Sequence, residues 1–155
     1  MGIERIGVVG AGQMGSGIAH VCALAGYDVL LTDVSEDALA AAVQKVSGNM
    51  DRQVSKGLIT AADKDEGLRR IDTTLKLTDL GPTDLVIEAA TERETVKQAI
   101  FEDLLPHLTP DTILTSNTSS ISITRLASRT DRPEKFMGFH FMNPVPIMQL
   151  VELIR

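Results

Sequence analysis

The sequence IGVVGAGQMGSGIA at residues 6–19 joins an apolar run, a glycine-rich turn and the start of a helical pattern. Gly10, Gly12 and Gly15 stand at the spacing G-x-G-x-x-G. In this motif the first glycine permits a tight turn, the second lets the backbone approach a pyrophosphate, and the third lets the helix pack close to the strand. The N-terminus of that helix then offers free N–H groups and the positive end of its dipole to the phosphates. The stretch predicts a dinucleotide-binding strand–turn–helix unit.

A second apolar segment at residues 27–33 follows and ends in an acid, Asp33. Asp33 follows Gly15 at close to the roughly 20-residue separation expected for a carboxylate that binds the adenosine ribose. Because a carboxylate in this place repels a 2′-phosphate, we expect NAD rather than NADP as the cofactor. The alternative is an ordinary βαβ turn followed by a solvated Asp.

The composition is that of a globular protein of one domain. The chain has 155 residues, of which 43% are apolar and 23% charged, and no apolar run reaches the roughly 18 residues of a membrane span. The first strand begins too near Met1 to leave room for a signal peptide, so we expect a cytoplasmic protein. A net charge of −6 without a basic tract argues against a nucleic-acid partner. The single cysteine, Cys22, lies on the apolar face of the first helix and is expected in the core.

Hydrophobic periodicity predicts that helices and strands alternate along the chain. Ser35 and Thr60 are expected to cap helices, and an acidic first turn follows Thr60. The expected helices after the glycine turn are 35–56, 60–70, 93–105 and 121–128, and the expected strands after the second are 71–77, 84–89, 112–116, 135–139 and 150–154. This order predicts an α/β fold, a Rossmann-type doubly wound, mostly parallel sheet in a single domain over residues 1–155.

In such a sheet, ligands bind beyond the carboxyl ends of the strands. Polar residues follow several of the expected strands: Asp33; Glu88 with Ala89 and Glu92; residues 116–120; and residues 140–143. We therefore expect these residues to converge on the edge of the sheet that the glycine turn faces.

Ser119, His140 and Glu152 are the residue types that a proton-transfer site uses. A His can take a hydroxyl proton as a hydride leaves the same carbon, and a carboxylate beside its other ring nitrogen favours the imidazolium that forms. A Ser hydroxyl can bind the substrate oxygen. The alternatives are a structural His, a solvent-facing Glu152 and a plain turn at the SNTSS segment. His20 and His107 have no such partners in the sequence and are expected to be structural.

Four segments together resemble one family. GAGQMGSGIA, IEAATE, SNTSS and FHFMNPVPIMQLVE are similar to segments of the NAD-binding domain of the L-3-hydroxyacyl-CoA dehydrogenases, particularly the bacterial 3-hydroxybutyryl-CoA dehydrogenases. The resemblance runs from about residue 3 to residue 155. It implies reversible hydride transfer between C3 of a short-chain (3S)-3-hydroxyacyl-CoA and NAD, with no metal.

The resemblance also implies roles for individual residues. His140 corresponds to the general base, Glu152 to its orienting acid and Ser119 to a substrate-binding hydroxyl. Asn49 and Lys56 correspond to contacts with the CoA moiety. The implied cofactor contacts are Gly10, Gly12, Gln13, Met14, Gly15, Asp33, Glu92, Lys97, Ser119 and Asn143.

Members of this family continue into a helical domain that completes the substrate site and forms a homodimer, and this chain ends before it. We therefore expect the chain alone to bind NAD but to be poorly active or inactive. An apolar group near the C-terminus predicts either self-association or burial in the domain's own core; its members are Phe141, Met142, Val145, Ile147, Met148 and Leu150.

Three other functions stay open on the sequence. The chain is also compatible with a non-catalytic dinucleotide-binding module, since a fold alone confers no activity. It is compatible with another β-hydroxyacid dehydrogenase, although those are expected to use a catalytic Lys where this sequence offers His140. The third alternative is a protein-interaction domain whose functional surface is its exposed C-terminal edge.

Overall fold

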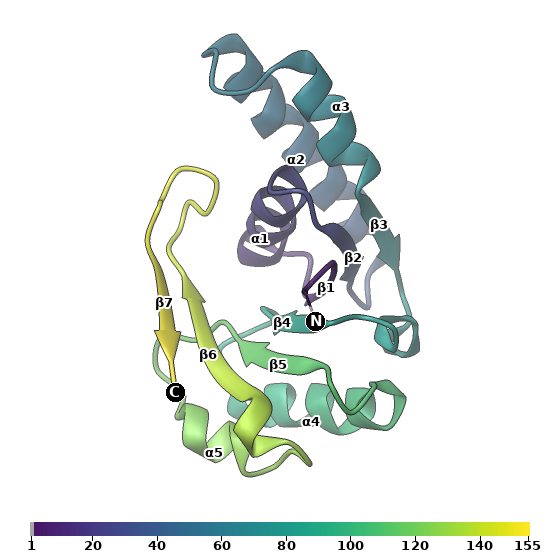
Figure 1. The fold of residues 1–155 in the computed structure, drawn as a ribbon, viewed down its shortest axis with the longest axis vertical. Helices are drawn as coiled ribbons and strands as arrows, with labels where there is room; N and C mark the ends of the chain where they lie inside the picture. Colours follow the sequence, from purple (N-terminus) through teal and green to yellow (C-terminus); the bar gives the residue numbers. More distant parts are fainter. Residues whose placement is uncertain (1) are drawn as a thin grey trace.

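A seven-stranded sheet runs through the molecule in the order β3-β2-β1-β4-β5-β6-β7 (Figure 1). The computed structural model describes residues 2–155. The strands are β1 (Arg5–Val9), β2 (Asp28–Thr32), β3 (Ile71–Thr74), β4 (Leu85–Glu88), β5 (Ile113–Ser116), β6 (Phe136–Phe141) and β7 (Val151–Ile154). Every neighbouring pair is parallel except β6 and β7. The predicted Rossmann-type, mostly parallel sheet is confirmed.

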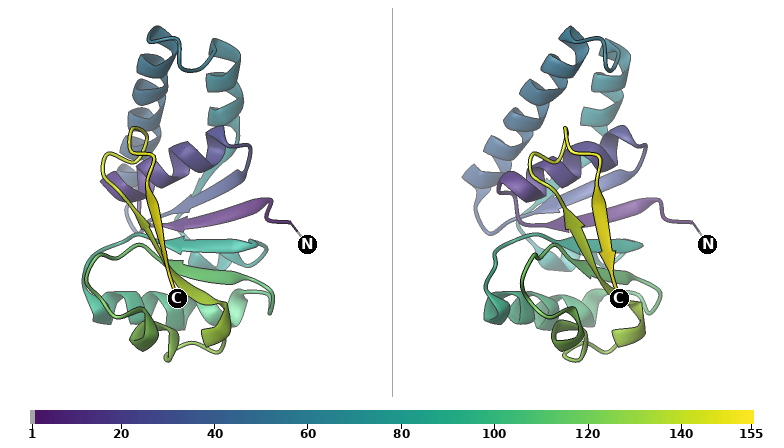
Figure 2. Two further views of the ribbon diagram at one scale, coloured as in Figure 1. Left: turned by 60° about the vertical axis from the view of Figure 1, so that its left-hand side comes forward. Right: turned by 90° about the vertical axis from the view of Figure 1, so that its left-hand side faces the viewer.

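Helices cover both faces of the sheet (Figure 2). They are α1 (Gln13–Leu24), α2 (Glu36–Ser55), α3 (Ala61–Arg69), α4 (Glu94–Leu104) and α5 (Ile123–Ala127), with short 3-10 turns at Leu77–Leu80, Leu105–His107 and Pro133–Lys135. In Figure 2, α1, α2 and α3 lie on one side of the sheet, and α4 and α5 lie on the other.

Burial on both faces explains the continuous apolar runs of the central strands. In β1, Val8 packs with the cluster that includes Ile18 of α1 and Leu39 of α2, whereas the next residue, Val9, packs with the cluster that includes Phe101 of α4 and Leu126 of α5. Successive side chains of a strand point to opposite faces, so a strand between two helical layers must be apolar throughout. The core therefore has two parts, one on each side of the sheet.

The two helix caps predicted from the sequence, Ser35 and Thr60, are confirmed, whereas the helix expected at 121–128 is shorter and spans Ile123–Ala127. The Ala38 N–H donates to the Ser35 hydroxyl at 3.1 Å, which caps α2. At α3, the Asp63 N–H donates to the Thr60 hydroxyl and the Thr60 N–H donates to the Asp63 carboxylate, which is a capping box. These caps satisfy N–H groups that have no partner inside their helices.

The last two strands differ from the expectation. β6 extends to Phe141, so His140 lies within the strand rather than after it, and β7 runs antiparallel to it. The reason is that residues 142–150 connect the two strands without a helix, so the chain reverses direction instead of crossing over. The expected edge strand at residues 71–77 is also shorter and ends at Thr74.

The C-terminal apolar group is divided between core and surface. Phe141 and Val145 are 7% and 4% exposed and belong to the core, whereas Ile147 and Leu150 are 71% and 57% exposed. Cys22 is buried, as predicted. None of the helices in residues 2–155 has both the length and the hydropathy needed to cross a lipid bilayer.

Candidate active site

In the glycine turn between β1 and α1, the space beside Gly12 at the start of the helix is free of protein atoms. Gly10 has φ +104°, and a Cβ there would lie 2.6 Å from the Ala89 carbonyl oxygen; a Cβ on Gly15 would lie 1.6 Å from the Gly10 carbonyl oxygen. A Cβ on Gly12, by contrast, would meet nothing within 4 Å. Gly12 is also the N-cap of α1 and supplies no capping side chain. The helix therefore begins with free N–H groups beside open space, which fits a pyrophosphate.

Asp33 lies directly after β2 and contacts the same turn. Its Oδ2 accepts a hydrogen bond from the Ala11 N–H at 2.8 Å, and its Oδ1 accepts one from the Ser35 N–H at 2.9 Å. These two bonds hold the carboxylate beside the glycine turn. A carboxylate oxygen has more than one lone pair, so Asp33 still has acceptor capacity for ribose hydroxyls.

An apolar cavity of about 220 Å³ adjoins Asp33. Only Gly10 and Asp33 among its lining residues belong to the motifs that predict a site from the sequence. The others come from five separate segments, and they are Val9, Thr32, Val34, Leu75, Leu77, Ala90, Val96 and Ile100. Apolar walls beside the Asp33 carboxylate have the character that the flat face of an adenine base needs.

His140 and Glu152 face each other across the antiparallel pair β6–β7. They are directly opposite in the strand register, and the His140 Nδ1 lies 3.3 Å from the Glu152 Oε2. The His140 side chain is 21% exposed and that of Glu152 is 51% exposed. Because Nδ1 is occupied by the carboxylate, Nε2 is the ring nitrogen available to a substrate.

Ser119 lies exposed in the loop after β5, and the loop is held on both sides of it. The Thr118 and Ser120 hydroxyls each donate to the Glu92 Oε2 at 2.9 Å. The Asn117 Oδ1 accepts a hydrogen bond from the Phe141 N–H at 2.9 Å, which joins this loop to the strand that contains His140. Ser119 and His140 thus belong to segments that are bonded to each other.

Lys97 differs from the other predicted cofactor contacts that have polar side chains, because its side chain is fully buried. Its Nζ lies 2.7 Å from the Glu88 Oε1, 3.5 Å from the Asn117 carbonyl oxygen and 4.0 Å from the Glu92 Oε1. Glu88 also accepts hydrogen bonds from the Ser116 hydroxyl and the Ala90 N–H. In this structure Lys97 offers no surface to a ligand and neutralises a buried carboxylate beneath the loop.

Gln13 and Asn143 join the glycine turn to the end of β6. The Gln13 Nε2 donates to the Asn143 Oδ1 at 3.0 Å. Both residues are exposed, whereas Met14 beside them is half-buried. Polar residues from the glycine turn, β2, β4, β5 and β6 therefore meet along one edge of the sheet, as the sequence predicts.

A cavity of about 450 Å³ lies between α2 and the 144–149 segment, and it includes Asn49 and Lys56. Arg52 and Gln53 lie on the same wall and were not predicted from the sequence. Their i, i+3 and i+4 spacing from Asn49 was the available signal, because residues three and four apart share one helix face.

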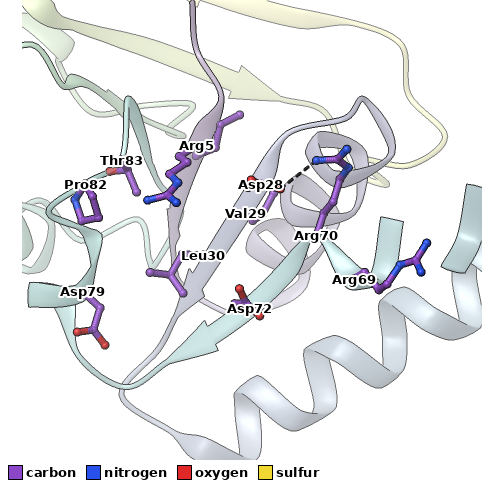
Figure 3. Close-up of a pocket in the computed structure, with 11 residues that line it drawn as sticks. Arg5, Asp28, Val29, Leu30, Arg69, Arg70, Asp72, Asp79, Pro82 and Thr83 are labelled. Carbon is purple, nitrogen blue, oxygen red and sulfur yellow. Dashed lines mark hydrogen bonds and ion pairs between the residues drawn. The ribbon is translucent and has the colours of Figure 1, made fainter. Parts of the chain in front are cut away.

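Another cavity, of about 350 Å³, lies at the amino ends of β1 and β2, away from the predicted site (Figure 3). Its walls mix both charges, and Arg70 is paired with Asp28 at 2.9 Å. None of the predicted site residues lines it. Within residues 2–155, no group of three or more His, Cys, Asp or Glu side chains has an arrangement that suits a metal ion.

Known proteins match this chain over nearly its whole length. Residues 5–155 match the family "3-hydroxyacyl-CoA dehydrogenase, NAD binding domain". A 3-hydroxybutyryl-CoA dehydrogenase of Bradyrhizobium diazoefficiens is 59% identical over 99% of this chain and 52% of its own length. A 3-hydroxyadipyl-CoA dehydrogenase of Escherichia coli is 43% identical over 98% of this chain and 32% of its own length.

The crystal structure of an (S)-3-hydroxybutyryl-CoA dehydrogenase from Ralstonia eutropha superposes with a TM-score of 0.95 at 46% identity, over 98% of this chain and 54% of that chain. This chain spans about half the length of the Bradyrhizobium relative. The family match, the fold and the glycine turn agree with one another, and the chain belongs to the family of NAD-binding domains of the 3-hydroxyacyl-CoA dehydrogenases.

Proposed function

We propose that this chain is the cofactor-binding half of an oxidoreductase that transfers a hydride reversibly between C3 of a short-chain (3S)-3-hydroxyacyl-CoA and NAD. The observation that carries the proposal is the His140–Glu152 pair, 3.3 Å apart on the last two strands of an NAD-binding sheet. A dinucleotide-binding module without catalysis has no use for such a pair. The Bradyrhizobium and Ralstonia relatives, named as 3-hydroxybutyryl-CoA dehydrogenases, support the choice of substrate class.

His140 acts as the general base in this proposal. With its Nδ1–H donated to Glu152, the Nε2 carries a lone pair that can take the C3 hydroxyl proton. Glu152 then stabilises the imidazolium and fixes the tautomer. NAD, when bound, supplies the carbon that accepts the hydride. In the reverse direction His140 returns the proton to the carbonyl oxygen.

Ser119 donates a hydrogen bond to the oxygen on C3 as it changes between alcohol and carbonyl. The hydroxyls that flank it are tied to Glu92, and its loop is tied to the His140 strand. A donor held in place before the reaction stabilises developing charge without having to reorganise. The loop therefore positions the Ser119 hydroxyl as well as binding the substrate.

The cofactor is held by the residues that surround the glycine turn. We assign the pyrophosphate to the open space at Gly12 and the N-terminus of α1, the adenosine ribose to Asp33, and the adenine to the apolar cavity beside it. Gln13, Met14, Glu92 and Asn143 are assigned to the nicotinamide half. Lys97 contributes indirectly, because its buried pair with Glu88 supports the loop that contains Ser119.

The acyl-CoA is assigned to the cavity between α2 and residues 144–149. Asn49 lines this cavity, and Lys56 offers an exposed cation for a CoA phosphate. A further helical domain, present in the other half of a complete enzyme, would close the substrate site and form a homodimer. The exposed Ile147 and Leu150 are then part of the surface which that domain covers, and they favour self-association when left bare. We place the enzyme in the cytoplasm, and the single cysteine of this chain, Cys22, which is buried and unpaired, suits that compartment.

The test uses this chain and a chimera in which it is joined to the second half of the Bradyrhizobium relative. The chain alone should bind NADH but oxidise it slowly or not at all with acetoacetyl-CoA. The chimera should oxidise it, and His140→Ala in the chimera should lower kcat by about 10²–10⁴-fold with an unchanged Kd for NADH. Full turnover by the His140→Ala chimera would refute the proposed mechanism.

A further inference from the structure

The His20 ring is buried between α1 and α2 and has one polar partner. His20 is 0% exposed, and its Nε2 lies 2.8 Å from the Gln53 Oε1. Its Nδ1 has no hydrogen-bond partner within residues 2–155. Burial lowers the pKa of His20, so the ring is neutral near pH 7. Since an amide oxygen only accepts hydrogen bonds, the Nε2 of His20 carries the proton and donates it to Gln53.

This bond fixes the orientation of the Gln53 amide. With its Oε1 occupied by His20, the free end of Gln53 is the NH₂ group, which has two N–H donors. Gln53 is half-buried and lines the cavity between α2 and residues 144–149. A buried imidazole thus holds an amide whose donors are available on a cavity wall.

The two walls of the cavity differ in character. α2 supplies polar side chains, among them Asn49, Gln53 and Lys56, whereas the opposite segment supplies Ile147 and Met148. The pantetheine arm of CoA consists of two amides separated by methylene groups, so it needs apolar contact and amide hydrogen bonds along the same length. One apolar wall and one wall with amide groups meet both needs.

We propose that Gln53, oriented by His20, donates a hydrogen bond to a pantetheine carbonyl of the acyl-CoA. This inference rests on the proposed function and extends it to a residue that sets affinity for the acyl carrier. Gln53 is a substrate-binding residue in this scheme, and His20 is a positioning residue that acts through it. A purely structural role of the His20–Gln53 hydrogen bond, which joins α1 to α2, predicts a different result. In that case, substitution of either residue lowers the stability of the chain and affects all ligands alike.

The experiment measures Kd values of this chain by calorimetry for acetoacetyl-CoA, for adenosine 3′,5′-bisphosphate and for NADH. The bisphosphate has the nucleotide part of CoA and lacks the pantetheine arm. Gln53→Met should weaken acetoacetyl-CoA binding about fivefold to tenfold, the effect of one lost hydrogen bond. The Kd values for the bisphosphate and NADH should stay unchanged. Gln44→Met, on an exposed face of α2, is the matched control and should change none of the three.

Two variants of His20 test whether this residue orients the Gln53 amide. His20→Leu removes the hydrogen-bond donor to Gln53. It should weaken the binding of acetoacetyl-CoA and leave the other two Kd values unchanged, as Gln53→Met should. His20→Gln restores an N–H near the place of Nε2 and should recover most of the affinity. Urea unfolding identifies any variant that is not folded. If His20→Leu does not fold, the Kd values of the His20→Gln variant are compared with those of wild type and Gln53→Met.

The outcomes separate this inference from the proposed function. Wild-type binding of acetoacetyl-CoA with no effect of Gln53→Met would overturn the inference and leave the proposed function standing. Equal weakening of the binding of all three ligands would also overturn it, because that pattern indicates a structural role for Gln53. A wild-type chain that binds NADH but neither CoA probe would overturn both the inference and the proposed acyl-CoA site.

Discussion

Asp33 accepts a hydrogen bond from the backbone N–H of Ala11 at 2.8 Å, so the acid after β2 is bonded to the glycine turn after β1. The carboxylate therefore has a structural task in addition to the assigned ribose contact. Its other oxygen accepts from the Ser35 N–H at the start of α2. One side chain thus joins three segments around the cofactor site.

The double task of Asp33 predicts different results for two substitutions. Asp33→Ala removes both backbone hydrogen bonds and should lower the free energy of unfolding by about 1–3 kcal/mol. Asp33→Asn keeps one acceptor and should lower it less. Both should weaken NADH binding, and Asp33→Asn should reduce the preference for NADH over NADPH because the negative charge is gone. Urea unfolding and fluorescence titrations with both cofactors measure these effects. An unchanged cofactor preference would contradict the assignment of the ribose to Asp33.

Two glycines of the same turn should respond in opposite ways to alanine. Gly15→Ala places a Cβ 1.6 Å from the Gly10 carbonyl oxygen, so the backbone must shift, at a cost of about 3 kcal/mol or more. Gly12→Ala meets no protein atom within 4 Å and should leave the unfolding free energy nearly unchanged. It should nevertheless weaken NADH binding at least about tenfold, because the methyl group occupies the space assigned to the pyrophosphate. Equal NADH affinity of wild type and Gly12→Ala would place the pyrophosphate elsewhere.

Local sequence signals were sufficient for most of the fold. Hydrophobic periodicity and capping residues depend on neighbours within a few positions, and Ser35 and Thr60 cap helices as predicted. The direction of β7 was not predictable in this way, since it depends on the path of residues 142–150 and on pairing with β6. That pairing also placed His140 inside a strand, opposite Glu152.

The arrangement of the candidate site was predictable from the sequence where one motif contains the residues, and less predictable where contacts between distant segments determine it. The residues of the glycine turn and Asp33 follow from spacing alone. The burial of Lys97 does not, because it arises from Glu88 and Asn117, which are near in space but not in sequence. The same holds for the apolar walls beside Asp33, which are contributed by segments as distant as Leu75 and Ile100.

The buried pair of Lys97 and Glu88 predicts a large loss of stability when only one partner is removed. Lys97→Met leaves the Glu88 carboxylate buried and uncompensated, and should lower the free energy of unfolding by about 3–5 kcal/mol. The double variant Lys97→Met with Glu88→Gln removes both charges and should recover part of that loss. Chemical denaturation of wild type, the single variant and the double variant measures the difference. A single variant as stable as wild type would mean that water or a ligand reaches this pair.

Cys22 should be unreactive in the folded chain. It is 8% exposed, and burial raises the pKa of its thiol to about 12, so almost no thiolate is present at neutral pH. An aromatic disulfide reagent at about pH 8 should therefore modify the native chain very slowly. The same reagent should modify one thiol per chain at once in guanidinium chloride, because Cys22 is the only cysteine. Rapid modification of the native chain would show that α1 opens readily.

The His20 environment predicts that stability falls as the solution becomes acidic. Burial lowers the pKa of His20 in the folded chain, although the hydrogen bond to Gln53 partly opposes this effect. On acidification the unfolded chain therefore binds a proton first, near its ordinary pKa of about 6.5, and unfolding becomes easier. The stability contributed by neutral His20 is present above that pH and is lost below it, by at most about 1.4 kcal/mol per pH unit.

Urea unfolding between about pH 7.5 and pH 5 measures this loss, and His20→Gln should remove it because the variant has no titrating ring at that position. His107→Gln is the matched control, since His107 is exposed in the 3-10 turn after α4, and it should keep the wild-type pH dependence. If the His20→Gln variant lost stability with the same slope as wild type, the acid sensitivity would belong to other groups, and His20 would not be held neutral against Gln53.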